Sequence, residues 1–282
     1  MNHRPLIAGW ALAGAWILAQ AAGAGDLADV KARGKLIMLC YPTQTSTFVA
    51  VNVEAMREKD LRLDEVRDPQ YFKGLDVDLV KGFAKSLGVG LEIRPLTKGY
   101  DALLPALVAR EGDLVASSLT STPKREETAD FSAPYHTSWV VVAVPAKSKI
   151  TSLDDLKGKK VALMHGSSQL EFVQSLVPDV KIQLTDFSLE NYVAVQEGQA
   201  DFTLMDSRAP VGESVAVAYP DLKVALRAKE FGYRVAFRKG SDLVVAFNSY
   251  LASAKQSGEL DRIVERHDSV WWGDKKPAPA KP

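Results

Sequence analysis

The segment 118–125, Ser-Leu-Thr-Ser-Thr-Pro-Lys-Arg, places a guanidinium close to several hydroxyl groups. Thr122 precedes a proline and predicts the start of a helix, because proline is favoured at the first helical position. Arg125 then falls in the first turn, beside backbone N–H groups that have no helical partner. A planar guanidinium in this setting can bind a carboxylate through two parallel hydrogen bonds. The alternative is a surface ion pair of Arg125 with Glu126 or Glu127, and these residues alone favour neither.

A second candidate segment is His-Gly-Ser-Ser at 165–168, between a predicted strand and a predicted helix. Its glycine lets a ligand approach the backbone closely. The hydroxyls of Ser167 and Ser168 can donate hydrogen bonds to an anion. Ser168 with Glu171 also matches a capping box, which accounts for both residues without any ligand. The sequence favours the cap, although one serine can serve both purposes.

Asp206 and Tyr100 are the remaining candidates. Asp206 follows an apolar strand, where its carboxylate could accept hydrogen bonds from a ligand ammonium or cap a following turn. Tyr100 precedes a predicted helix, where its ring could stack on a ligand or belong to the core. The residues by themselves leave both pairs of alternatives open.

Alternating strands and helices must position these side chains. We expect strands at 34–39, 91–95, 113–119, 160–164 and 201–205, with helices that end near residues 88, 112, 158, 176 and 198. This alternation predicts an α/β fold of mainly parallel sheets with flanking helices. Ligands of such sheets bind beyond the carboxyl ends of the strands, where the candidate segments lie.

Two apolar runs, 139–144 and 233–237, lie on either side of the second group of elements. They predict two lobes joined by two crossover strands. Residues 25–138 and 234–270 would form lobe 1, and residues 139–233 lobe 2. We also expect an exposed helix over 55–66, one helix over 242–264 and a disordered tail over 271–282.

Composition excludes several classes of protein. Of the 282 residues, 46% are hydrophobic and 25% charged, and 35 basic residues balance 35 acidic ones. Such usage is typical of a globular chain and offers no overall field for binding nucleic acid. The single cysteine, Cys40, excludes an intrachain disulfide and any CxxC site. The spacing of His136, His165 and His267 does not support a metal site, so we expect no metal and no cofactor.

The N-terminus predicts export. His3 and Arg4 precede an apolar run over 6–19, and Ala-Gly-Ala follows at 22–24. This order is typical of a secretory signal peptide over residues 1–24, with cleavage before Gly25 and delivery to the periplasm. A retained N-terminal anchor is the alternative, but the apolar run is short for a membrane span.

The chain resembles the extracytoplasmic solute-binding proteins of family 3, the polar amino-acid binding proteins of ABC importers, which have the periplasmic binding protein-like II fold. The resemblance covers nearly all of residues 30–270. It rests on a series of segments in order: Gly-Leu-Asp-Val-Asp-Leu at 74–79, Tyr-Asp-Ala-Leu-Leu-Pro-Ala-Leu at 100–107, 118–125, Asp-Phe-Ser-Ala-Pro-Tyr at 130–135, Asp-Asp-Leu-Lys-Gly-Lys at 154–159, Gly-Gln-Ala-Asp at 198–201, and Asp206.

The resemblance implies a role for each candidate residue. Arg125 resembles the clamp for a ligand α-carboxylate, with help from the hydroxyls or N–H groups of the residues matching Thr120, Ser167 and Ser168. Asp206 resembles the acceptor for the α-ammonium, to which Ser118 would offer its carbonyl. Tyr100 would wall the side-chain pocket.

The implied function is capture of an amino acid or similar small carboxylate between the lobes, and delivery to an inner-membrane ABC permease. We expect a monomer that is not an enzyme. Cyclohexadienyl dehydratases share the scaffold, so a periplasmic dehydratase with Glu171 or His165 as its general acid is one alternative. A second is an accessory protein without transport function. One departure from the family supports it: the segment 40–73 is longer than usual by roughly fifteen residues, with Phe48 as a tentative match to a family aromatic.

Overall fold

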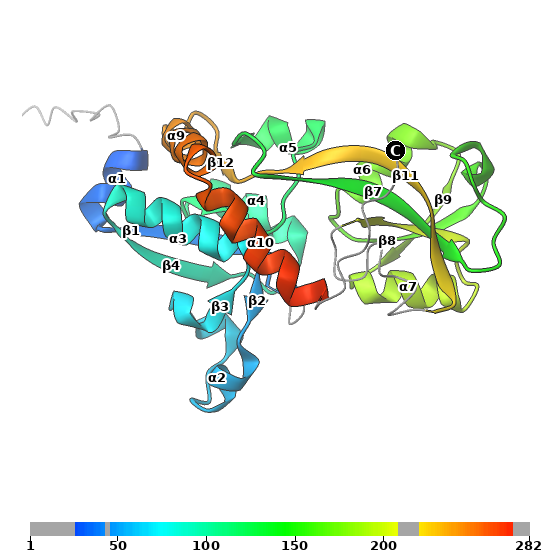
Figure 1. Cartoon of the computed structure of the whole chain (residues 1–282), viewed down its shortest axis with the longest axis horizontal. Coiled ribbons are helices and arrows are strands. Elements are labelled where there is room, and N and C mark those ends of the chain that lie inside the picture. Colours follow the sequence, from blue (N-terminus) through cyan, green and yellow to red (C-terminus); the bar gives the residue numbers. More distant parts are fainter. Residues whose placement is uncertain (1–25, 43–45, 208–219, 273–282) are drawn as a thin grey trace, which may run out of the picture.

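The computed structural model describes residues 26–42, 46–207 and 220–272 (Figure 1). Two lobes lie side by side, each built on a five-stranded sheet with flanking helices. In each sheet four strands share one direction and one strand opposes them, which follows from the pairings. The predicted α/β fold with two lobes of mainly parallel sheets is confirmed.

The sheet of lobe 1 has the order β4-β1-β5-β12-β6. Its strands are β1 (Lys35–Cys40), β4 (Gly90–Pro95), β5 (Leu114–Val115), β6 (Ala129–Phe131) and β12 (Ala236–Arg238). Its helices are α1 (Asp26–Arg33), α3 (Leu75–Leu87), α4 (Leu103–Val108), α5 (Pro123–Thr128), α9 (Leu243–Gln256) and α10 (Glu259–Trp272), and a 3-10 turn over Tyr100–Ala102 precedes α4. The strands form because both faces are covered: five of the six residues of β1 are buried.

The sheet of lobe 2 has the order β11-β7-β10-β8-β9. Its strands are β7 (His136–Pro145), β8 (Lys160–Met164), β9 (Lys181–Thr185), β10 (Phe202–Asp206) and β11 (Leu222–Tyr233). Its helices are α6 (Gln169–Leu176) and α7 (Ser188–Gln196), with a 3-10 turn over Asp154–Leu156. The apolar run in β7 is wholly inaccessible from Val140 to Val144.

The chain passes between the two sheets twice, at residues 132–135 and 234–235. Long strands β7 and β11 pair with each other over most of their length and run toward lobe 1 (Figure 1). Tyr233 at the end of β11 forms a bridge to Thr120 of lobe 1, and the Arg234 N–H donates to the Leu119 carbonyl. The run 233–237, expected as one strand, is therefore the junction between β11 and β12.

A small projection from lobe 1 accounts for the long segment 40–73 (Figure 1). It contains β2 (Ala50–Val51), α2 (Val53–Arg57), 3-10 turns over Leu63–Glu65 and Pro69–Tyr71, and β3 (Phe72–Lys73). The exposed helix expected over 55–66 is wrong, because α2 ends at Arg57 and Asp60 adopts a left-handed φ of 50°. Gly74 joins the projection to α3. A Cβ there would lie 2.2 Å from the Phe48 carbonyl oxygen, so the position requires glycine.

Three further expectations fall at the ends of the chain. The single helix expected over 242–264 is two helices, because Gly258 breaks the helix with a left-handed φ of 70°. α10 continues to Trp272, two residues into the segment 271–282 that was expected to be disordered. The remainder of that tail and the predicted signal peptide lie outside the described residues.

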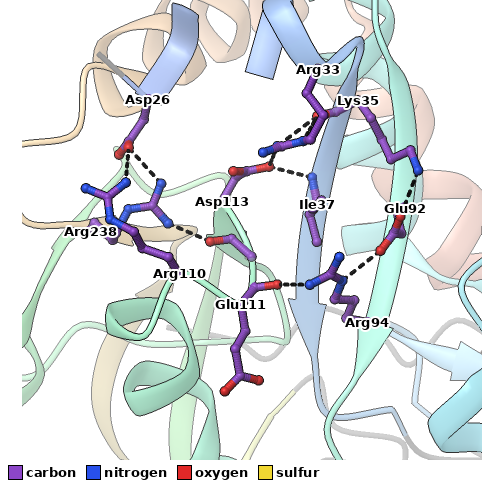
Figure 2. Close-up of polar contacts among 11 residues, drawn as sticks. Asp26, Arg33, Lys35, Ile37, Glu92, Arg94, Arg110, Glu111, Asp113 and Arg238 are labelled. Carbon is purple, nitrogen blue, oxygen red and sulfur yellow. Dashed lines mark hydrogen bonds and ion pairs between the residues drawn. The ribbon is translucent and has the colours of Figure 1, made fainter. Parts of the chain in front are cut away.

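Charged side chains at the beginnings of the lobe 1 strands pair with one another (Figure 2). Asp113 accepts hydrogen bonds from the Arg33 guanidinium and from the Ile37 N–H, the latter at 2.7 Å. Asp26 pairs with Arg238 at 2.8 Å and so attaches α1 to β12. These contacts lie at the opposite end of the sheet from the carboxyl ends of its parallel strands.

Candidate functional site

Arg125 lies in the first turn of α5, as the Thr-Pro start predicted. The Thr122 hydroxyl caps this helix by accepting a hydrogen bond from the Arg125 N–H at 3.3 Å. The guanidinium donates to two carbonyls, Thr120 O and Gly166 O, each at 2.8 Å. Burial lowers the pKa of Arg125. Among the described residues no carboxylate forms an ion pair with it, so the alternative of a pair with a neighbouring glutamate is wrong.

Asp206 is the last residue of β10 and points toward the crossover strands. Its carboxylate accepts one hydrogen bond from the Tyr233 hydroxyl at 2.8 Å and one from the Gln169 amide at 2.7 Å. Burial raises its pKa to about 6, against the lowering effect of these two donors. Like Arg125, this carboxylate has no ion pair within the described chain.

Tyr100 lies within electrostatic reach of both charged groups. Burial raises the pKa of its hydroxyl to about 12; the charge of Asp206 raises this pKa further, whereas that of Arg125 lowers it. The hydroxyl is 3.1 Å from the Ser118 Oγ, and the ring lies 5.1 Å from the ring of Tyr41. A guanidinium and a carboxylate from different lobes thus share one aromatic neighbour.

Ser118 follows the short strand β5 with a left-handed φ of 47°. Its N–H donates to Asp76 Oδ2 at 2.6 Å, and its own hydroxyl donates to the Ser117 carbonyl. Asp76 is inaccessible, and it accepts a second bond from the Tyr135 hydroxyl at 2.5 Å. Burial raises the pKa of Asp76 to about 6. The role of Asp76 was not foreseen; its place on the buried side of an apolar helix was the available signal.

The segment 165–168 leads into α6, but the capping box expected there is wrong. Ser168 is the residue before the first turn, yet its side chain makes no capping hydrogen bond, because its φ of −64° and ψ of −20° are helical. Glu171 instead accepts a hydrogen bond from the Thr122 hydroxyl of lobe 1, at 2.7 Å. Ser168 is buried, and the Ser167 Oγ is buried without a hydrogen-bond partner.

Three contacts join the lobes at this place. Arg125 donates to the Gly166 carbonyl, and Thr122 donates to Glu171. Gly166 also packs against Asp101: it has a left-handed φ of 69°, and a Cβ there would lie 2.4 Å from the Asp101 carboxylate. The sequence indicated Thr122 only as a helix start, and it gave no signal for Gln169 or for the hydroxyl of Tyr233.

The described ranges contain no group of three or more His, Cys, Asp and Glu side chains that could hold a metal ion. Within the same ranges, no helix has the length and apolar character needed to span a bilayer. The arrangement of the predicted site residues is thus a set of hydrogen-bonding and charged groups from two lobes.

Two curated relatives are similar over most of the chain. The arginine-binding extracellular protein ArtP of Bacillus subtilis is 32% identical over 214 residues, which cover 73% of this chain and 82% of that protein. The L-cystine-binding protein TcyJ of Escherichia coli is 32% identical over 206 residues, 71% of this chain and 74% of that protein.

Solved structures of amino-acid-binding proteins are also similar to the chain. The amino acid ABC transporter substrate-binding protein AbpA of Streptococcus pneumoniae, bound to L-arginine, has a TM-score of 0.69 at 26% identity, with 86% of this chain and 98% of that chain covered. The ancestral amino acid-binding protein AncCDT-1, a precursor of cyclohexadienyl dehydratase, has a TM-score of 0.69 at 30% identity, with 86% and 99% covered.

The sequence profile that describes the bacterial extracellular solute-binding proteins, family 3, matches residues 61–269. The match includes all the site residues discussed above and begins within the projection that was recognised as a departure from the family. The chain belongs to the bacterial extracellular solute-binding proteins, family 3.

Proposed function

We propose that this protein captures an α-amino acid in its zwitterionic form between the two lobes. The observation that supports this proposal is the pair of opposite charges, Arg125 and Asp206, each half-buried and without an ion pair, although Glu171 and Asp101 lie within electrostatic reach of Arg125. A buried charge is costly unless another charge or several hydrogen bonds compensate for it. An amino acid carries both missing partners on one carbon atom.

The carboxylate of the ligand would bind to the Arg125 guanidinium, with the buried Thr120 and Ser168 beside it. The Ser167 hydroxyl, which lacks a partner, is the further donor on that side. The ammonium would bind to Asp206 and to the Ser118 carbonyl. Tyr100 would line the space for the ligand side chain.

The two charged groups lie on different lobes, so a zwitterion would connect lobe 1 to lobe 2. The contacts from Arg125 to Gly166 and from Thr122 to Glu171 already join the lobes in this arrangement. A ligand that bridges the lobes favours their closed arrangement, which is the hinge mechanism of binding proteins of this type. We propose that an ABC permease of the inner membrane receives the ligand from this closed form.

The names of the relatives suggest which ligands to test first. ArtP is named for arginine and TcyJ for L-cystine. A thermal-shift screen of the chain from Gly25 against amino acids, polyamines and dicarboxylates would identify the ligand, because a compound that binds only the folded state raises the melting temperature. A screen in which only polyamines without a carboxylate bind would contradict the proposal.

Calorimetry with the ligand so identified tests Arg125 directly. We expect Arg125→Ala to weaken binding by ~2–5 kcal/mol, because the ligand carboxylate loses its charged partner in a desolvated site. Lys124→Ala, a change at the exposed neighbouring cation, is the matched control and should leave the affinity unchanged. Equal affinities of the Arg125→Ala variant and the unchanged protein would refute the role of the guanidinium.

Delivery to the periplasm is part of the proposal and has its own test. We expect the full chain, expressed in a Gram-negative host, to appear in the periplasmic fraction. Its N-terminal sequence should begin at Gly25. A protein that retains Met1 and stays with the inner membrane would instead support the anchored alternative.

A dehydratase is the second candidate, and one observation favours it. Glu171 does not cap α6; its carboxyl group lies at the junction of the lobes, where it accepts a hydrogen bond from the Thr122 hydroxyl. A general acid in contact with a bound carboxylate substrate is what such an enzyme needs. Incubation with prephenate or arogenate distinguishes the two functions: formation of an aromatic product would establish the enzyme, and its absence together with amino-acid binding would support the receptor.

A further inference from the structure

Exposed large hydrophobic side chains gather at one edge of lobe 2. Seven such side chains occur in the described chain, and five of them lie within residues 182–193: Ile182, Leu184, Phe187, Leu189 and Val193. The other two, Val108 and Val245, are isolated. Clusters of exposed apolar side chains on soluble proteins mark interaction sites more often than scattered ones do.

The cluster surrounds β9, which is an edge strand of its sheet. The other edges of the two five-stranded sheets carry features that disfavour pairing with another strand. β11 is rich in charged side chains and has two register shifts, β4 contains Glu92, Arg94 and a proline, and β6 has only three residues. In β9, by contrast, Lys181 at the start is the only charged residue.

The backbone of β9 leaves two residues free to pair. The Lys181 N–H donates a hydrogen bond to the Lys159 carbonyl, and the Thr185 carbonyl accepts one from the His165 N–H. Both groups therefore point toward β8. The N–H and C=O groups of a strand residue point to the same side and alternate along the strand. Ile182 and Leu184 therefore present their N–H and C=O groups at the open edge.

Both faces of the sheet are apolar beside this edge. Ile182 and Leu184 are in register with Val161 and Leu163, which belong to the core under α6. Their side chains thus lie on the α6 face. The opposite face carries α7, from which Leu189 and Val193 border a groove of about 420 Å³ beside β9.

We propose that this edge pairs with β9 of a second copy of the chain, in an antiparallel register centred on Gln183. A two-fold axis through Gln183 places Ile182 opposite Leu184 of the copy, and each such pair exchanges both backbone hydrogen bonds. The two sheets become one continuous sheet, with the two α7 helices side by side on one face.

Charge supports a second copy as the occupant. β9 begins with a basic residue, Lys181, and is followed by an acidic one, Asp186. In the antiparallel arrangement Lys181 lies opposite Thr185 of the copy, next to its Asp186. Parallel pairing would instead bring like charges together, which is unfavourable. This dimer differs from the monomer expected from the sequence, and it leaves the ligand site untouched.

A disulfide tests the register. In the proposed dimer, residue 183 of one copy lies opposite residue 183 of the other as a non-hydrogen-bonded pair. Their Cα atoms would be about 4.5 Å apart, which a disulfide can span. Gln183→Cys in the otherwise intact mature chain should therefore form a covalent dimer on mild oxidation. Lys181→Cys is the matched control, because residue 181 and its copy lie about 13 Å apart along the strands. The native Cys40 is fully buried and does not interfere.

Sedimentation of the mature chain tests the dimer itself. We expect the dimer fraction to rise with protein concentration, and Leu184→Lys to abolish it while Val245→Lys, at the isolated exposed valine, preserves it. Amino-acid binding by Leu184→Lys should be unchanged. A monomer at all concentrations, or equal disulfide formation by the two cysteine variants, would overturn the proposal. Loss of amino-acid binding in every variant would instead contradict the proposed function.

Discussion

The two ends of the lobe 1 sheet use charged residues in opposite ways. At the end where the parallel strands begin, Asp113 pairs with Arg33, and Asp26 with Arg238 (Figure 2). At the end where the strands lead into the interlobe region, Arg125 donates hydrogen bonds only to carbonyls, and the charges of Glu171 and Asp101 act on it from nearby. Across from it, Asp206 has only neutral donors.

The two groups of charges therefore differ in the partners that the fold supplies to them. Arg238 holds the pKa of Asp26 low despite the opposing effect of its burial, whereas burial raises the pKa of Asp113 although Arg33 pairs with it. Asp206 is half-buried with neutral donors only, and the loss of solvent raises its pKa. The free protein therefore bears an energetic cost at Asp206 that a bound ammonium would relieve.

The largest expected effect is loss of ligand binding between the lobes, with a smaller loss of stability. We expect Asp206→Ala to weaken amino-acid binding by ~2–5 kcal/mol, because the ligand ammonium loses its charged acceptor. The melting temperature should fall by less than this loss of affinity would suggest: the Tyr233 hydroxyl and the Gln169 amide lose their acceptor, but the substitution also removes a charge that has no ion pair. Calorimetry and thermal unfolding measure the two quantities. If Asp206→Ala strongly lowered the melting temperature but left the affinity of the folded protein unchanged, Asp206 would have a structural role and the prediction would be wrong.

At the end of the sheet where the parallel strands begin, we expect a substitution to lower stability and to leave ligand affinity unchanged. Asp113→Ala leaves the buried Ile37 N–H without its acceptor and removes the partner of Arg33. We expect a loss of ~1–3 kcal/mol in the free energy of unfolding, measured by urea denaturation, with an unchanged affinity for the ligand. A weaker affinity in the folded variant would show that the two ends are energetically coupled.

The pH dependence of binding should follow Asp206. Its pKa is raised to about 6 in the free protein, and a bound ammonium stabilises the carboxylate and lowers that pKa. Binding then releases a proton below pH 6, so the affinity should be about tenfold weaker at about pH 5 than at neutral pH.

The same carboxyl affects folding in the same pH range. Its pKa is higher in the folded state than in the unfolded state, so its contribution to stability falls as pH rises from about 4 to about 6. Asp76, with a pKa also raised to about 6, should act likewise on stability. Calorimetry of Asp206→Asn across this range should show a flat affinity; a persistent slope would point to another group.

The smallest expected effect concerns the contact that joins the lobes. Glu171→Ala removes the acceptor of the Thr122 hydroxyl, and we expect ligand affinity to fall by ~0.5–1.5 kcal/mol as the closed arrangement loses one hydrogen bond. Glu171→Gln keeps an oxygen acceptor and should restore most of the affinity. Equal losses in both variants would indicate that the charge of Glu171, rather than its hydrogen bond, matters.

Local patterns predicted the elements better than the contacts among them. The strand over 160–164 and the helix ending near 176 agree with β8 and α6, because apolar spacing and terminating residues act within a few positions. The Thr122 cap was likewise local. The Ser168 cap failed because the tertiary structure gave Glu171 a partner in the other lobe and kept Ser168 in a helical conformation.

The two-lobed α/β fold and the family could be predicted before any long-range contact was known. Those features follow from periodicity and from short ordered segments. Only the tertiary structure decided which charges are paired and which are not: Arg125 received carbonyls, Asp206 received Tyr233 and Gln169, and β9 was left at an open apolar edge. The reason is that hydrogen bonding and burial depend on groups far apart in the chain, which come together only when the lobes fold.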